Sequence, residues 1–88
     1  MTTVCVHGPL RRLAGGRAEL TATGATVRAV IAAVEQEHPD LGGWILDEQS
    51  RIRRHIHVYL NGERATEDDA VNGGDRVEVL PAISGGSE

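Results

Sequence analysis

Apolar and polar residues alternate in two short runs near the start of the chain. Residues 2–7 form a β-rich run that ends at Gly8-Pro9. Residues 17–23 alternate more loosely, and the side chains expected on one face are Ala18, Leu20 and Ala22. An arginine-rich turn joins the two runs, which predicts an antiparallel hairpin.

Helical spacing follows the hairpin. Apolar residues recur at i, i+3, i+4 and i+7, namely at Val27, Val30, Ile31 and Val34. Thr26 is a suitable N-cap, and Pro39 ends the helix because it disfavours helical backbone at the residue before it. The apolar stripe of this helix needs a sheet to pack against.

The next segment, residues 40–54, has a weaker pattern. We expect a short helical turn pinned to the core, followed by a loop over residues 47–54. The residues that would form this turn are Leu41, Trp44, Ile45 and Leu46.

Residues 55–60 give the clearest strand pattern. Alternation turns Ile56, Val58 and Leu60 to one side. The residues on the other side are His55, His57 and Tyr59. Asn61-Gly62 is a hairpin turn signal.

Residues 63–74 are polar and loop-like, and we expect a short strand at Arg64-Ala65 and one helical turn near Asp68. A last strand is predicted over residues 76–80, with Val77 and Val79 pointing inward. The order of elements indicates an α+β fold, in which one main helix crosses a mixed sheet of four or five strands. Residues 1–81 would form the domain and residues 82–88 a flexible tail.

Composition narrows the function. The formal net charge is −4 and all nine basic residues are arginine, so bulk charge does not favour nucleic-acid binding. No apolar run approaches the roughly 20 residues that span a bilayer. A secretory signal is not evident at the N-terminus and there is one cysteine, so we expect a cytoplasmic protein without membrane contact.

Two possible reactive groups are disfavoured. Cys5 lies within a β-run, where a lone cysteine is usually a small buried residue rather than a persulfide carrier. His55 and His57, even with His7 nearby, lack the further converging ligand that zinc needs. We therefore expect no metal site.

Three segments carry a family resemblance. Residues 58–62 place Asn-Gly at the end of a strand, and residues 71–81 place Gly-Asp before the last strand. Residues 82–86 end in Gly-Gly. In this combination the chain resembles the ubiquitin-like β-grasp sulfur carriers, the group that includes the MoaD, ThiS and CysO proteins. It looks most similar to the CysO type of cysteine biosynthesis.

The resemblance implies a carrier, not an enzyme, with no bound cofactor. An E1-like enzyme would use ATP to adenylate the Gly86 carboxylate. A sulfur donor of the rhodanese or cysteine desulfurase type would then replace AMP and leave a thiocarboxylate. That sulfur would pass to a synthase that makes cysteine, a cofactor or a natural product.

The tail would enter these partner enzymes through its last residues before the extension, which are Ala82, Ile83, Ser84, Gly85 and Gly86. Glycine adds no side chain, so Gly-Gly suits a narrow channel. Ser87 and Glu88 depart from the mature pattern, and similar carriers with such extensions are trimmed by a JAMM-type metallopeptidase. We therefore expect cleavage of the Gly86–Ser87 bond.

Several alternatives stay open at this stage. The chain could be a protein modifier conjugated through Gly86, a small subunit of molybdopterin synthase, or an interaction module with an inert tail. One sheet face could be plain solvated surface or a docking face for partner enzymes, built from His57, Tyr59, Glu78 and Leu80. Six arginines could meet acidic loops of a partner enzyme: Arg11, Arg12, Arg17, Arg51, Arg53 and Arg54.

Overall fold

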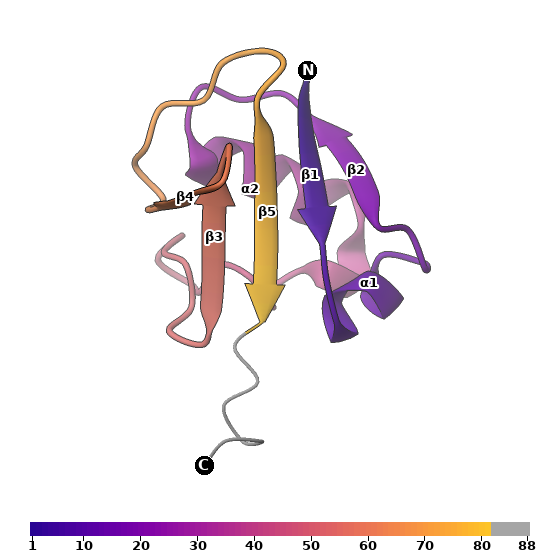
Figure 1. Cartoon of the computed structure of the whole chain (residues 1–88). Helices are drawn as coiled ribbons and strands as arrows, with labels where there is room; N and C mark the ends of the chain where they lie inside the picture. Colours follow the sequence, from indigo (N-terminus) through magenta and orange to yellow (C-terminus); the bar gives the residue numbers. More distant parts are fainter. Residues whose placement is uncertain (82–88) are drawn as a thin grey trace.

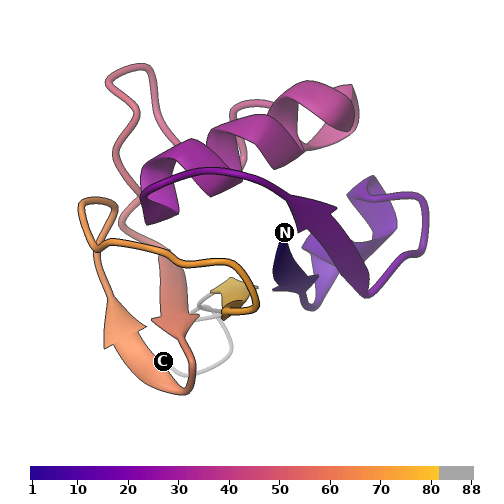
Figure 2. The same cartoon turned by 90° about the horizontal axis from the view of Figure 1, so that it is seen from above.

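Five strands form one mixed sheet, and the main helix lies across one of its faces (Figures 1 and 2). The computed structural model describes residues 1–81. The elements are β1 (Thr2–Val6), α1 (Pro9–Leu13), β2 (Glu19–Ala22), α2 (Val27–Glu37), the 3₁₀ helix η1 (Pro39–Leu41), β3 (Ile56–Leu60), β4 (Glu63–Ala65) and β5 (Arg76–Pro81).

The strand order is β2-β1-β5-β3-β4. β1 and β5 run parallel, whereas β1 with β2, β3 with β4 and β3 with β5 are antiparallel. The predicted hairpin, the mixed sheet and the α+β class are thus confirmed. β5 is the central strand, although it is the last in sequence.

Helix α2 forms for the reasons read from the sequence. The Thr26 hydroxyl accepts a hydrogen bond from the Ala29 amide at 3.2 Å, which caps the helix. Its apolar stripe is fully buried against the sheet. The core includes Val27, Val30, Ile31 and Val34 from α2 and Val4, Val6, Val58, Val77 and Val79 from the strands.

A short helix that the sequence pattern did not reveal follows β1. In α1, Pro9 occupies the first turn, where its missing N–H costs nothing, and Leu10 is buried. The following Ala14 is buried as well. Five residues are too few for a helical repeat to stand out, so this segment was expected to be only a turn.

Trp44 is not part of the core. Leu41, Ile45 and Leu46 are buried as expected, but 51% of Trp44 is exposed. Helix η1 ends at Leu41, and Gly43, with a φ of 83°, turns the backbone before Trp44. The expected helical turn therefore stops short, and the indole ring is turned toward solvent.

The expected helical turn near Asp68 is also wrong. The Asp69 amide donates to the Thr66 carbonyl at 3.2 Å, and the Asp69 carboxylate accepts from the Thr66 amide at 2.9 Å. This reciprocal pair closes a single polar turn without a helix.

Glu35 connects α2 to the segment that follows it. Its Oε2 accepts hydrogen bonds from the backbone amides of Ile45 at 3.1 Å and Leu46 at 3.0 Å. A carboxylate near a helix C-terminus is unfavourable for the helix dipole. Here it is offset by two charge-assisted hydrogen bonds that fix a buried segment.

The turn between β3 and β4 is tied to the start of β5. Asn61 and Gly62 have φ values of 53° and 89°, as a two-residue hairpin turn of type I′ requires. The Asn61 side chain accepts from the Arg76 amide at 2.9 Å and donates to the Asp75 carboxylate at 3.2 Å. The Asn72 amide also donates to Asp75, at 2.8 Å.

These bonds predict a contribution to stability that depends on pH. The amide of Asn72 and the side chain of Asn61 hold the pKa of the Asp75 carboxyl below its ordinary value. The stabilisation is then present above the unfolded-state pKa of about 3.9 and is lost as pH falls through the lower folded-state pKa. We expect Asp75→Asn to be less stable than the parent near neutral pH, with a difference that shrinks in acid.

Urea unfolding at several pH values measures this difference. Asp40→Asn is the matched control, because Asp40 is exposed and makes no side-chain hydrogen bond within residues 1–81. If the free energies of unfolding of the parent and Asp75→Asn differ by the same amount at neutral and acid pH, the proposed role of the Asp75 carboxylate is wrong.

None of the helices within residues 1–81 is long and apolar enough to cross a membrane.

Candidate functional site

The last described residue of the chain is held by the centre of the sheet. β5 pairs with β1 on one side, where Val6 lies opposite Val79, and with β3 on the other, where Ile56 lies opposite Pro81. The predicted tail over 82–86, the reactive Gly86 and the proposed cleavage after it lie outside the described residues. These assignments, and the domain boundary at Pro81, stay predictions.

The loop after β1 packs against the end of β5. The His7 amide donates to the Val79 carbonyl at 3.2 Å. Gly8 follows with a φ of 63°, and a Cβ placed there would lie 3.1 Å from Cγ of Pro81. Gly8 thus allows a close approach between this loop and Pro81, the residue before the predicted tail.

Replacing Gly8 by Ala should strain this contact. We expect a loss of about 1–3 kcal/mol in the free energy of unfolding, because a left-handed backbone and a crowded Cβ both oppose the change. The amide resonances of Val79 and Leu80 should shift as Pro81 is displaced.

Gly43→Ala is the control for this variant, since Gly43 has a φ of 83° but nothing within 4 Å of the added Cβ. It carries the backbone cost alone. Equal losses of stability in the two variants, with unshifted Val79 and Leu80 amides, would show that the contact with Pro81 is unimportant.

The four residues of the predicted docking face do lie together. His57 is directly opposite Leu80, and Tyr59 is directly opposite Glu78, on adjacent strands. Cross-strand pairs of this kind place Cβ atoms about 4.5–5.5 Å apart. All four are partly exposed and lie on the sheet face opposite α2, hereafter the outer face. Their role in binding stays a prediction.

The outer face also carries ion pairs that were not predicted from the sequence. The Glu78 carboxylate lies 3.9 Å from His7 Nε2 and 3.3 Å from Arg76 Nε. Arg76 also reaches Glu19 at 3.6 Å, so this ion pair joins β5 to β2 across β1. Alternation within β1 and β5 could have predicted which side chains share the outer face. The order of the strands in the sheet, which brings Arg76 near Glu19, cannot be predicted from local sequence.

Cys5 is buried, as expected, but it does not belong to the main apolar cluster beneath α2. It lies opposite both Glu19 and Glu78, so it belongs to the outer face, and only 2% of it is exposed. Burial raises the pKa of its thiol, and the positive charge of Arg76 opposes that shift only in part. A protonated, covered thiol is unsuited to carrying sulfur.

The histidines of β3 have separate surroundings. His55 is exposed just before the strand, whereas Nδ1 of His57 is buried and finds no hydrogen-bond partner within the described chain. Across residues 1–81, no group of three or more His, Cys, Asp or Glu side chains is arranged to hold a metal ion.

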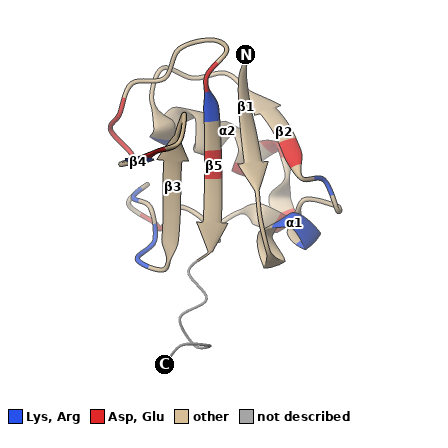
Figure 3. Cartoon of the chain, viewed as in Figure 1, with Lys and Arg blue, Asp and Glu red and all other residues tan. Residues whose placement is uncertain are grey.

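Arginine gathers at the end of the sheet where β5 ends. Figure 3 shows basic residues on α1 and on the loop before β3, on either side of that end. Acidic residues are concentrated in the loop between β4 and β5, at the opposite end. The surface around the base of the tail is therefore more basic than the net charge of −4 suggests.

Comparison with known proteins fits this geometry. The chain is 31% identical to the sulfur carrier protein CysO of Mycobacterium tuberculosis over 90 residues, which cover 96% of this chain and 97% of that one. It is 34% identical to small archaeal modifier protein 1 of Haloferax volcanii over 62 residues, covering 70% and 71% of the two chains.

A solved structure agrees with the fold. The crystal structure of the BexX/CysO complex of Amycolatopsis orientalis contains a chain that matches with a TM-score of 0.85 and 32% identity, covering 94% of this chain and 97% of that one. The ubiquitin-like β-grasp prediction is thereby confirmed. A model described as the ThiS family matches residues 4–86. The chain belongs to the ThiS family and is a CysO-like member of the ubiquitin-like sulfur carriers.

Proposed function

We propose that this chain carries sulfur as a thiocarboxylate on Gly86. The observation that carries the proposal is where the family match ends: it runs to residue 86 and leaves Ser87 and Glu88 outside. Between Pro81, which the sheet holds, and the end of that match lie five residues. A segment of that length spans at most about 17 Å when extended, enough to enter an active site while the domain stays outside.

The chemistry requires no catalytic side chain from this protein. A carboxylate oxygen of Gly86 attacks the α-phosphorus of ATP in the activating enzyme, and pyrophosphate leaves. A sulfur nucleophile then attacks the acyl carbon and displaces AMP. With hydrosulfide the product is the thiocarboxylate itself. With a persulfide donor the product is an acyl disulfide, and a second thiol cleaves its S–S bond, forming a disulfide with the donor and releasing the thiocarboxylate.

The outer face supports docking of the partner enzymes. It presents Leu80 and Tyr59 with ionisable neighbours, and Leu80 is the last residue of this face before Pro81. Partly exposed apolar residues ringed by polar groups are typical anchors in interfaces. The related CysO chain was crystallised in a complex with BexX, which supports action through a protein partner. The partners we propose are an E1-like enzyme, a sulfur donor and a sulfur-accepting synthase.

Maturation is a second part of the proposal. While Ser87 is joined to Gly86, the carbonyl of Gly86 is an amide and cannot be adenylated. A JAMM-type metallopeptidase that cleaves after Gly86 would release the reactive carboxylate.

Conjugation to other proteins is the alternative, favoured by the 34% identity to small archaeal modifier protein 1. The same activated Gly86 would then form an amide with an amine of a target protein. The two functions differ in the product that accumulates in cells.

Expression of an affinity-tagged chain in its native host separates them. Sulfur carriage predicts free chain that ends at Gly86 and is labelled by a thiocarboxylate-reactive sulfonyl azide. Conjugation predicts larger adducts that survive denaturing, reducing electrophoresis and are lost in Gly86→Pro. Adducts without any labelled free chain would overturn the carrier proposal in favour of the modifier.

A further inference from the structure

A cavity opens at the β4 edge of the sheet and adjoins the outer face, because its lining residue Arg64 lies opposite Tyr59. It has a volume of about 220 Å³ and an apolar floor formed by Ile56 and Val58 of β3 and Ala65 of β4. Arg53, Arg54 and Arg64 line its rim, and the cavity is hereafter called the arginine groove.

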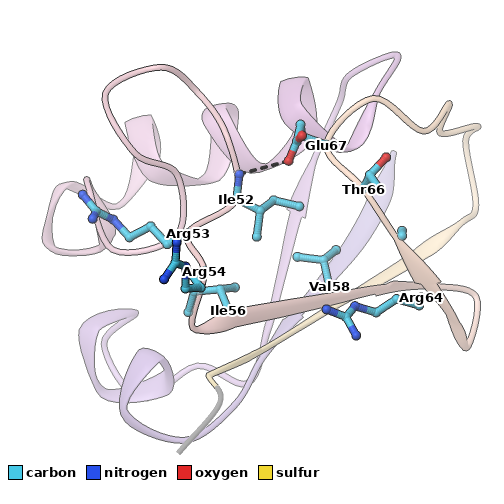
Figure 4. A pocket seen from close by; sticks show the side chains of 9 residues that line it. Ile52, Arg53, Arg54, Ile56, Val58, Arg64, Thr66 and Glu67 are labelled. Atoms are coloured by element: carbon cyan, nitrogen blue, oxygen red, sulfur yellow. Dashed lines mark hydrogen bonds between the residues drawn. The ribbon is translucent and has the colours of Figure 1, made fainter. Parts of the chain in front are cut away.

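Figure 4 shows Arg64 beside Val58 and Ile56, with Thr66 and Glu67 across the cavity. The groove exists because β4 is short. β4 pairs with residues 58–60 of β3 only, so no strand covers β3 beside Ile56 on this side within residues 1–81. Ile56 and Val58 are two positions apart, which gives the floor a length of about 7 Å along the strand.

Charge in the groove is not balanced internally. Arg54 and Arg64 are exposed, and neither forms an ion pair within the described part of the chain. Arg53 donates through Nε to the Gly43 carbonyl at 2.6 Å, a neutral partner. The one carboxylate of the lining, Glu67, accepts a hydrogen bond from the Ile52 amide at 3.1 Å. The guanidinium groups of Arg54 and Arg64 thus have no ion-pair partner within residues 1–81, and the carboxylate of Glu67 is already engaged.

We propose that the arginine groove binds a short, extended, acidic segment of a partner protein. Guanidinium groups bind carboxylates through paired hydrogen bonds, which a strand-like segment with acidic residues on one side would supply. Its apolar residues would contact the side chain of Ile52 and the stems of the arginines.

The groove does not fit a nucleic acid. No aromatic side chain lines it, so bases have nothing to stack on, and the chain as a whole carries a net charge of −4. The proposal does not rest on the chemistry at Gly86, because it is argued from the lining and charge of the groove alone.

Nuclear magnetic resonance can test the groove with a defined probe. The probe is an acetylated and amidated peptide of alternating glutamate and valine, titrated into the isotope-labelled full chain at low salt. We expect saturable shifts in the amides of residues 52–58 and 64–67, and weaker binding as salt is added. The same peptide with glutamine in place of glutamate should not bind.

Paired variants locate the charge that matters. Arg54→Gln together with Arg64→Gln should weaken the peptide affinity at least about tenfold, the effect of losing roughly one charged contact. Arg12→Gln together with Arg17→Gln removes the same charge from exposed residues elsewhere. This control should change the affinity by no more than about twofold.

Several results would overturn the proposal. These are equal binding of the glutamine peptide, equal weakening by the two variant pairs, no saturable binding at all, or shifts centred on His57 and Leu80 of the outer face. A single-stranded oligonucleotide that shifts the groove amides more strongly than the peptide would assign a different occupant. Well-dispersed spectra of the variants establish that each is folded.

Discussion

Replacing Leu80 by Glu is expected to lower the rate of adenylation by about 30- to 700-fold without unfolding the protein. Leu80 is the residue of the outer face closest to the end of β5, and it lies directly opposite His57. A carboxylate there would have to be desolvated against the activating enzyme, and truncation or disruption of one central anchor commonly costs about 2–4 kcal/mol. That free energy corresponds to the expected loss of rate.

The fold should tolerate this change, because Leu80 is partly exposed and is not a member of the buried core. Thr21→Glu is the matched control: it places the same charge on an exposed residue of β2. β2 is two strands from β5, about 10 Å away across the sheet.

Pyrophosphate exchange with the E1-like enzyme measures the rate, and urea unfolding measures the stability. Both variants should retain most of the parent's stability, and only Leu80→Glu should lose exchange. Unaltered exchange in Leu80→Glu, or equal loss in Thr21→Glu, would show that this block of residues is not the docking face.

Removal of Ser87 and Glu88 is expected to switch activation on. A chain ending at Gly86 should support ATP–pyrophosphate exchange, whereas the chain with Ser87 and Glu88 should give none, since its Gly86 carbonyl is part of an amide. Domain stability should be the same in both, because the buried apolar cluster is formed by residues between Val4 and Val79.

A third protein separates the size of the penultimate residue from the presence of a free carboxylate. A chain that ends at Gly86 but carries Gly85→Val has a free carboxylate and a bulkier tail, so it should fail if the partner channel admits only glycine. Exchange by the chain that still carries Ser87 and Glu88 would contradict the maturation step, whatever the other two proteins do.

Much of the fold could be predicted because its signals are local. Thr26 and the apolar stripe defined α2, and strict alternation through residues 55–60 assigned the two sides of β3. The same alternation brought His57 and Leu80 to one face, since side chains on paired strands share a face when their partners do.

The rest depended on contacts between distant segments. The position of Trp44 follows from a turn at Gly43, and the place of Glu35 follows from two amides that lie ten and eleven residues later. The arginine groove depends on how far β4 extends along β3, which is decided by the loop that leaves Ala65. Cys5 illustrates the limit clearly: burial was predicted, but not burial on the outer face between Glu19 and Glu78.

Intact-mass spectrometry of the reconstituted reaction tests the central claim most directly. The Gly86-terminated chain is incubated with ATP, the E1-like enzyme and a sulfide source, and the mass of the chain is followed. The account predicts a gain equal to the replacement of one oxygen by sulfur, confined by fragmentation to Gly86 and absent without ATP. A chain that is adenylated under these conditions but never gains sulfur would contradict it.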